Sequence, residues 1–343
     1  MSGKPAVARR SGTGWKLALR LAVSAVFLAV LVTRVPGLAD SIPKGQPLHT
    51  ALFLIAALIT VFVGIVLSAW RWQQVLVVFD AHVKVKSLTG LYLAGQFVGN
   101  VLPSTIGGDV LRVTRLSKTV ESTTVSFASV VLERLSGMIV LPLLVVTGFA
   151  LEPSLVHVDH AWVALLVAGV TLATLGLILF AAGHPGLGGR FASKPNWTRF
   201  IGAVFLGVDR ARHEPLQMLR VLGTALVYQL SIVLSYLLVF QALNSPVSIA
   251  SAIAFIPAVS MLQVIPISFN GLGVRESALV LFRHGFGVSA AVAGAAGLLW
   301  YGALLLVSML GAPITAVGHR GPNAADTANP PDTALHDSSI ETA

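Results

Sequence analysis

The chain has no cysteine and few charged residues: only 11% of its 343 residues are Asp, Glu, Lys or Arg. A soluble domain carries about 25%. The absence of cysteine excludes disulfides, thiol nucleophiles and cysteine-ligated zinc or iron–sulfur sites. The shortage of charge leaves a chain that is 55% hydrophobic, with a mean hydropathy of +0.83. This composition indicates an integral membrane protein.

Common enzyme and metal motifs are also missing. The sequence contains no Walker A motif, no Gly-x-Ser-x-Gly and no His-Glu-x-x-His. Its nine histidines form no His-x-x-x-His pair, and no two carboxylates have a spacing suited to two-metal chemistry. We therefore expect no metal, no cofactor and no catalytic residue, and direct use of ATP is not expected.

Long apolar runs predict an all-α, polytopic membrane bundle. A bilayer core about 30 Å thick needs about 20 apolar residues per helix. Six runs are expected to be full spans: 17–35, 48–70, 123–150, 161–182, 216–242 and 286–318. Two more, 88–110 and 248–284, are broken by proline and glycine. Irregular backbone at membrane depth needs protein or a wet cavity around it, so these are expected to be re-entrant hairpins or interrupted helices.

Charge between the runs orients the chain. Residues 1–16 carry four Lys or Arg and no acid, whereas the loop 151–160 carries two acids and no Lys or Arg. The positive-inside rule then predicts a multi-pass protein of the cell (plasma or inner) membrane with a cytoplasmic N-terminus. Basic residues flank segment 88–110 on both sides, so this hairpin is expected to enter from the cytoplasm. Residues 248–267 are long enough to span the membrane. The sequence therefore leaves open whether the second broken segment spans or re-enters, and on which side of the membrane the C-terminus lies.

The chain divides into three parts by composition. These are a basic segment 1–16, a transmembrane domain 17–318, and a tail 319–343 that is rich in Ala, Asp, Thr and Pro and carries four acids. The tail is expected to be disordered.

The two broken segments resemble each other. Residues 101–112 (VLPSTIGGDVLR) align without a gap with residues 264–275 (VIPISFNGLGVR) at an offset of 163 residues, with four identities. The same offset places 48–70 on 211–233 and 123–150 on 286–313. Repeat units of about 17–150 and 161–318, each with three full spans, would be inverted relative to each other, as in many transporters. The alternative is that proline and glycine recur in any membrane protein.

Proline, glycine and asparagine mark the predicted breaks. We take these as Asn100, Pro103, Gly107, Gly108, Pro266, Gly271 and Gly273. Such residues interrupt a helix and let backbone N–H groups approach a ligand.

Charged residues near these breaks are functional candidates, because charge inside a membrane is costly. The candidates for binding a lipid phosphate are Arg112, Arg134 and Arg275, and the candidate acidic partners are Asp109, Glu133 and Glu276. Adjacent helix residues point about 100° apart. We therefore expect Glu133 to pair with Arg112, and Arg134 to pair with Asp109.

Structural alternatives stay open for these charges. Arg112 could mark only the cytoplasmic border, and Glu133 and Arg134 could belong to a purely structural buried ion pair. Trp70-Arg71-Trp72, at the end of the second predicted span, has the composition of an interfacial anchor.

Three motifs together resemble a known family. They are Leu-Pro-Ser-x-x-Gly-Gly-Asp-x-x-Arg, the later Glu133-Arg134, and Ile-Pro-x-x-x-x-Gly-x-Gly-x-Arg-Glu. Their order and spacing, over roughly 15–318, are similar to the flippase-like transmembrane family, the membrane domain of lysylphosphatidylglycerol synthase that also occurs in stand-alone form. The resemblance implies translocation of a lipid headgroup between leaflets. Relatives are linked to aminoacylated phospholipids, hopanoids and polyprenyl-linked sugars, so the lipid stays open. The synthase's soluble aminoacyl-transfer domain is not expected here, so neither is synthesis of lysyl lipid.

The main hypothesis is therefore a flippase or scramblase-like protein that holds a phosphate-bearing lipid at two broken-helix hairpins. A second is a non-catalytic membrane partner of a glycosyltransferase or lipid synthase. A third is a membrane enzyme acting on polyprenyl or phospholipid phosphates, for which Ser104, Ser268 and Glu133 are the candidate residues. The direction, energy source and oligomeric state stay open.

Overall fold

The computed structural model is helical throughout its described residues, which are 41, 43, 45–101, 107–183, 205–208, 210, 213–264 and 271–316. Five helices are long and apolar enough to cross a membrane. These are α2 (Pro47–Val78), α5 (Thr123–Leu151), α6 (Ala161–Gly183), α9 (Pro215–Ala242) and α13 (Ala290–Ser308). They confirm the polytopic helical bundle and match five of the six predicted spans. The predicted span 17–35, the segment 1–16 and the tail 319–343 lie outside the described residues.

The two segments with proline and glycine are broken, as predicted. The first consists of α3 (Val85–Val101) and α4 (Gly107–Leu116). The second consists of α10 (Ile249–Leu262), α11 (Val274–Leu281) and the short α12 (Arg283–Phe286). Three short elements complete the described fold: η2 (Pro153–His157), η3 (Met309–Gly311) and α14 (Ala312–Ala316).

The second broken segment folds back on itself. Its first arm, α10, has 14 residues and so is about 21 Å long, too short for a hydrocarbon core of about 30 Å. The chain then returns beside this arm, because the ring of Phe255 in α10 contacts Phe282 and Phe286 with centroids 5.1 and 5.6 Å apart. The short first arm favours a re-entrant hairpin over a full span.

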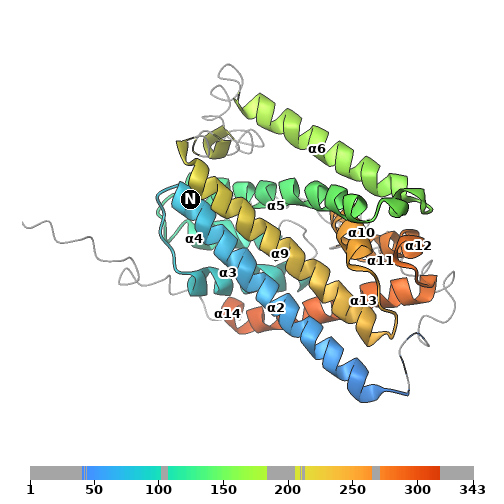
Figure 1. Cartoon of the computed structure of the whole chain (residues 1–343). Coiled ribbons are helices and arrows are strands. Elements are labelled where there is room, and N and C mark those ends of the chain that lie inside the picture. Colours follow the sequence, from blue (N-terminus) through green and yellow to red (C-terminus); the bar gives the residue numbers. More distant parts are fainter. Residues whose placement is uncertain are drawn as a thin grey trace, which may run out of the picture.

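Helices α2 and α9 lie antiparallel along their whole length (Figure 1). The Thr50 hydroxyl at the start of α2 donates to the carbonyl of Ala242 at the end of α9, at 3.2 Å. At the other end, the Gln217 side chain donates to the carbonyl of Gln74 at 3.0 Å. The offset of 163 residues maps α2 onto 210–241, so these are the two helices that the proposed repeat would equate.

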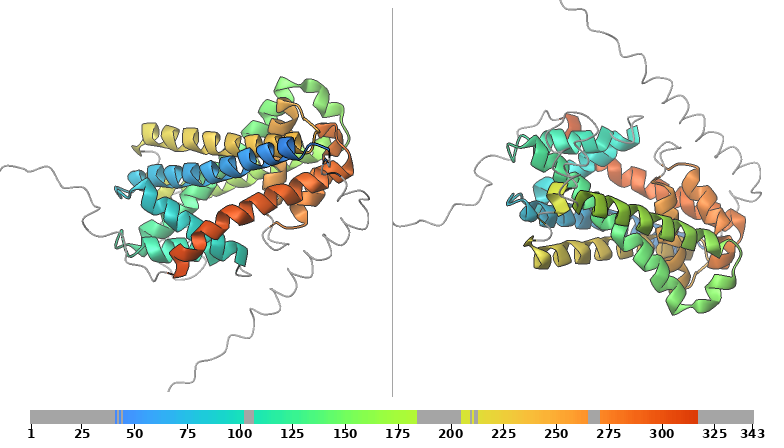
Figure 2. Two further views of the ribbon diagram at one scale, coloured as in Figure 1. Left: turned by 90° about the horizontal axis from the view of Figure 1, so that it is seen from below. Right: turned by 90° about the horizontal axis from the view of Figure 1, so that it is seen from above.

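The two hairpins lie at opposite ends of the bundle (Figures 1 and 2). Helices α3 and α4 lie at the end where α2 finishes, and α10 to α12 lie at the end where α5 finishes and α13 begins. Helices α5 and α13, also equated by the offset, run in opposite directions in Figure 1. This is the arrangement that an inverted repeat predicts.

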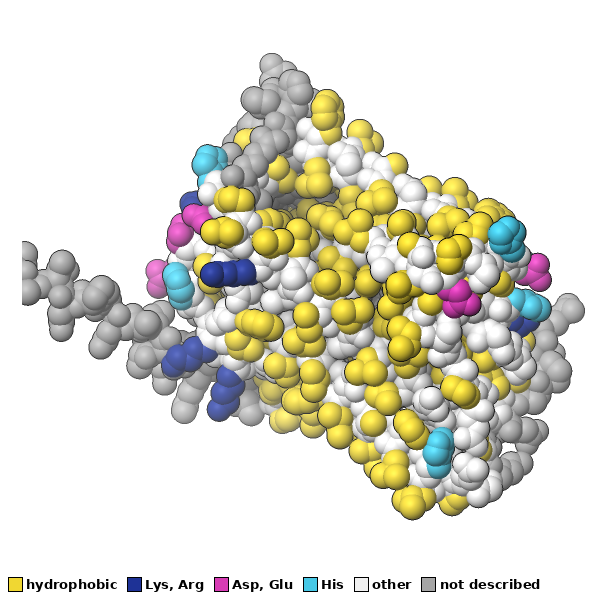
Figure 3. All heavy atoms as spheres, viewed as in Figure 1, with side chains coloured by type: hydrophobic (Ala, Val, Ile, Leu, Met, Phe, Trp, Pro, Cys, Tyr) yellow, Lys and Arg dark blue, Asp and Glu magenta, His cyan; other side chains and the backbone are white. Residues whose placement is uncertain are grey.

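On the face that Figure 3 shows, the surface between the two ends carries mainly hydrophobic and uncharged groups. Large hydrophobic side chains are exposed along it, among them Leu52, Ile59, Leu177 and Phe180, and a lipid environment would solvate them. The end with the first hairpin carries most of the described Lys and Arg residues outside the interior: Lys84, Lys86, Arg115, Lys118, Arg210 and Arg220. The opposite end carries Arg283 among the described residues.

The anchor interpretation of Trp70-Arg71-Trp72 is wrong for two of its three residues. Helix α2 does not end at residue 70 but continues to Val78, so all three lie inside the helix. Arg71 and Trp72 are buried, and only Trp70 is partly exposed. The helix can continue past Arg71 because an acid in the interior compensates its charge, as described next.

Candidate functional site

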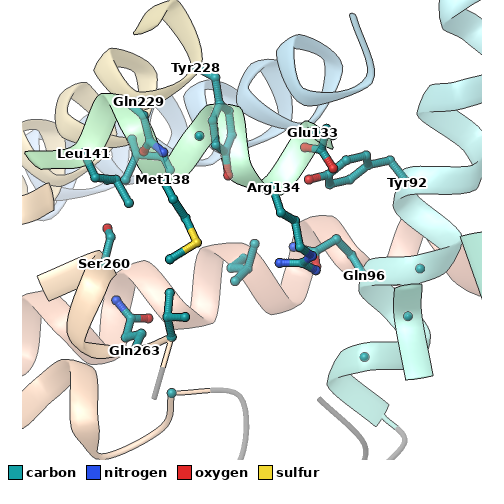
Figure 4. A pocket seen from close by; sticks show the side chains of 18 of the residues that line it. Tyr92, Gln96, Glu133, Arg134, Met138, Leu141, Tyr228, Gln229, Ser260 and Gln263 are labelled. Carbon is teal, nitrogen blue, oxygen red and sulfur yellow. The ribbon is translucent and has the colours of Figure 1, made fainter. Parts of the chain in front are cut away.

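A cavity of about 640 Å³ lies between the two hairpins (Figure 4). Its lining comes from α2, α3, α4, α5, α9, α10, α11 and α13. Four arginines contribute to the lining: Arg71, Arg112, Arg134 and Arg275. The structure therefore brings all three arginines that the sequence singled out to one cavity, and it adds Arg71. No group of three His, Asp or Glu residues that could hold a metal occurs in the described part of the chain.

Glu133 is the centre of the buried charge cluster. Its carboxylate is 1% exposed and accepts hydrogen bonds from the guanidiniums of Arg71 and of Arg112, the latter at 2.9 Å. The predicted pairing of Glu133 with Arg112 is thus confirmed. One carboxylate holds two buried cations, from α2 and α4, against α5. Arg71 was not selected as a site residue from the sequence, because its tryptophan neighbours are typical of a membrane–water interface.

Arg112 is fixed by aromatic rings as well as by Glu133. Its guanidinium lies over the rings of Trp72 and Tyr92, 4.1 Å from each centroid. Trp72 is itself held by a hydrogen bond from its indole N–H to the hydroxyl of Ser129 at 3.0 Å. The cation–π contacts supplement the charge pairing. Arg112 is 3% exposed and is part of the packed interior rather than of a border.

Arg134 is the arginine most open to the cavity. Its side chain is 59% exposed and donates through Nε to Asp109 at 2.7 Å, which confirms the predicted pairing. Figure 4 shows Arg134 and Met138 reaching from α5 into the cavity. The neighbouring Glu133 turns to the packed side, as the helical angle between adjacent residues requires.

Close backbone contact between α3 and α4 positions Asp109. A Cβ on Gly108 would collide with the carbonyl of Gly95, so position 108 needs glycine for the helices to meet. Helix α4 begins at Gly107 and carries Asp109 in its first turn, where a carboxylate is favourable. Asn100 is buried at the end of α3, and Pro103 lies outside the described residues.

The second hairpin holds Arg275 in a similar setting. Its Nε donates to the side-chain oxygen of Gln263 at 2.9 Å, and Nη1 lies 3.7 Å from Glu276. The rings of Trp300 and Tyr301 lie 5.0 and 4.8 Å from the guanidinium carbon. Thus Arg112 and Arg275, equated by the repeat, each lie against two aromatic rings and beside an acid.

Glycines shape the start of α11. Gly271 and Gly273 have φ angles of +75° and +83°, which side chains with a Cβ rarely adopt. The backbone N–H of Gly273 donates to Glu276 at 2.6 Å, so Glu276 caps the helix and also faces Arg275. Pro266 lies outside the described residues.

The fold and the cavity define a polytopic helical membrane protein with an interior charged site between two broken-helix segments. Residues 17–311 match the family model described as the lysylphosphatidylglycerol synthase TM region. The chain belongs to this family, and its function therefore lies in the context of membrane lipids. Comparisons with curated proteins and with solved structures gave no match.

Proposed function

We propose that the protein translocates a phosphate-bearing lipid between the leaflets, with the phosphate held by arginine in the cavity between the hairpins. The observation that carries the proposal is the cavity itself: re-entrant hairpins from opposite ends of the bundle meet one interior space lined by four arginines. Broken helices of an inverted repeat commonly form the substrate site of a transporter.

Arg134 is the proposed first contact for the phosphate. It can exchange its partner at lower cost than the buried arginines, because its side chain is 59% exposed and ion pairs become weaker as they approach the fully exposed limit of about 0–1 kcal/mol. The pairs of Glu133 are different, since breaking a buried pair costs about 3–5 kcal/mol. A phosphate would therefore displace Asp109 from Arg134 more readily than it would displace Glu133 from Arg71 or Arg112. A guanidinium suits this role because it can bind two phosphate oxygens at once.

The distribution of charge supports a cytoplasmic location for the end with the first hairpin. Most of the described Lys and Arg outside the interior lie there, whereas the acids Glu152 and Asp159 lie at the other end. The positive-inside rule then gives the orientation that the sequence predicts, and the second hairpin would enter from outside.

Translocation is preferred over catalysis for this site. Glu133, the candidate acid that lies in the described part of the chain, is engaged by two guanidiniums. Ser104 and Ser268 lie outside the described residues. A role as the membrane partner of a lipid-modifying enzyme or glycosyltransferase remains a separate proposal from sequence.

The test is reconstitution of purified protein into liposomes with fluorescent phospholipids, followed by dithionite quenching of the outer leaflet. We expect quenching beyond half of the label, and a rate reduced by about tenfold or more in Arg134→Gln, which removes the guanidinium. The matched control is Lys118→Gln, an exposed cation outside the cavity, which should leave the rate unchanged. Quenching that stays at half for every lipid in folded protein, or equal rates for both variants, would refute the proposal.

A further inference from the structure

We infer that the lipid carried in this cavity has a neutral, hydroxyl-bearing headgroup beside its phosphate, such as glycerol or a sugar, and not a cationic amine. The inference rests on the proposed function and names the substrate class of the same site. Two observations carry it: the engagement by arginine of the carboxylates around the cavity and of three of the aromatic rings that line it, and a group of neutral polar side chains away from Arg134.

The carboxylates around the cavity are already engaged. Asp109 pairs with Arg134 and Arg112, Glu133 with Arg71 and Arg112, and Glu276 with Arg275 and a backbone N–H. Four arginines thus face three carboxylates, which leaves one positive charge in excess among these described side chains. A lipid with a net negative charge would neutralise the excess charge, whereas a zwitterionic lipid would leave it in place and a lipid with a net positive charge would add to it.

Aromatic rings offer the other common binding site for an ammonium. Here the rings that line the cavity already hold guanidiniums: Tyr92 holds Arg112, Tyr228 holds Arg71 and Trp300 holds Arg275. Tyr236 is stacked on Trp300, with centroids 4.9 Å apart and an angle of 8° between the rings. A cationic headgroup would therefore compete with arginine for these acids and rings.

Neutral polar groups gather on the side of the cavity away from Arg134. Figure 4 shows Gln229, Ser260 and Gln263 on that side, with Met138 between them and Arg134. Tyr236 also lines the cavity, two turns along α9 from Gln229. These side chains offer amide and hydroxyl groups without net charge.

The Tyr236 hydroxyl has a specific need for a partner. Tyr236 is 1% exposed, and its hydroxyl makes no hydrogen bond within the described part of the chain. A buried polar group left unpaired costs about 1–3 kcal/mol. The Ser260 hydroxyl donates to the carbonyl of Ile256 and keeps its acceptor capacity. A headgroup hydroxyl can donate to one of these oxygens and accept from the other, which an alkylammonium, having no acceptor, cannot do.

The test compares four fluorescent lipids in the liposome assay with the full-length protein: phosphatidylglycerol, phosphatidylinositol, phosphatidylethanolamine and lysylphosphatidylglycerol. We expect the first two to move about tenfold faster than the two amine lipids, a preference set by the excess charge. A difference between the first two would distinguish glycerol from a cyclic polyol. Amine lipids that move as fast or faster overturn this inference and leave the proposed function standing. If none of the four moves, the proposed function itself fails.

Two variants tie the preference to the cavity. Gln229→Glu adds a carboxylate that cancels the excess positive charge of the cavity, so we expect faster movement of phosphatidylethanolamine and slower movement of phosphatidylglycerol. Gln241→Glu, on the same helix but outside the cavity lining, is the matched control and should leave the ratio unchanged. An unchanged ratio in Gln229→Glu, or an equal shift in the control, contradicts the inference.

Tyr236→Phe removes only the hydroxyl. We expect slower movement of phosphatidylglycerol but unchanged movement of phosphatidylmethanol, an anionic phosphodiester whose headgroup has no hydroxyl. An equal loss for both lipids, or no loss for either, overturns the assignment of Tyr236 to the headgroup.

Discussion

Replacement of Glu133 by glutamine should destabilise the protein strongly. The substitution keeps the size of the side chain but removes the negative charge that holds Arg71 and Arg112, which are 4% and 3% exposed. Two atoms of the Arg71 guanidinium, Nε and Nη1, already make no hydrogen bond within the described residues. Loss of one partner from a buried ion pair costs about 3–5 kcal/mol. Because both arginines share one carboxylate, we expect one loss of this size rather than two.

The free energy of unfolding can be measured in mixed detergent micelles by titration with SDS, followed by circular dichroism. The double variant Glu133→Gln/Arg71→Met should regain at least about 1 kcal/mol over the single variant, because it removes one of the unpaired charges. Glu152→Gln is the control, since among the described residues the Glu152 side chain accepts from an exposed serine and its loss should cost less than about 1 kcal/mol. A loss below about 1 kcal/mol for Glu133→Gln would refute the reasoning, since it would mean that water in the cavity solvates both cations.

Two further predictions concern packing and topology. Gly108→Ala should lower the free energy of unfolding by about 1–3 kcal/mol, because its Cβ would collide with the carbonyl of Gly95. The control is Gly223→Ala in α9, whose Cβ would meet nothing within 4 Å and which should not destabilise the protein. Equal losses of stability in the two variants would contradict the close contact of α3 and α4. Because the natural chain has no cysteine, single cysteines can report sidedness: an impermeant maleimide added to intact cells should label Asp159→Cys at once and Lys118→Cys only after permeabilisation. Labelling of both from outside would contradict the arrangement of the bundle, and the reverse pattern would contradict the orientation.

Much of the architecture follows from local sequence patterns. Apolar length predicts the five described spans, and proline and glycine predict both breaks. The pairings of Glu133 with Arg112 and of Arg134 with Asp109 were also predictable, because charges in a membrane must be compensated and adjacent residues face different ways.

The role of Arg71 depends on contacts that local patterns do not contain. Its partner Glu133 lies 62 positions away in the chain. The local sequence Trp-Arg-Trp does not distinguish a membrane interface from a protein core. The aromatic rings around Arg112 and Arg275 were missed for the same reason. Trp72 and Tyr92 do not align with Trp300 and Tyr301 at the offset of the repeat, so only the folded chain brings equivalent rings to equivalent arginines.

The central claim is that a lipid phosphate occupies the cavity beside Arg134, and photo-crosslinking from Met138 tests it most directly. Met138 points into the cavity next to Arg134 (Figure 4). A benzophenone amino acid at this position, activated in native membranes, should give a phospholipid adduct that mass spectrometry identifies. The same probe at Leu177, which is exposed on α6, reports the bulk lipid. We predict an adduct at Met138 that is enriched in anionic lipid relative to the Leu177 adduct and is lost in Arg134→Gln. No lipid adduct at Met138, or one that matches the bulk lipid and survives Arg134→Gln, would contradict the account.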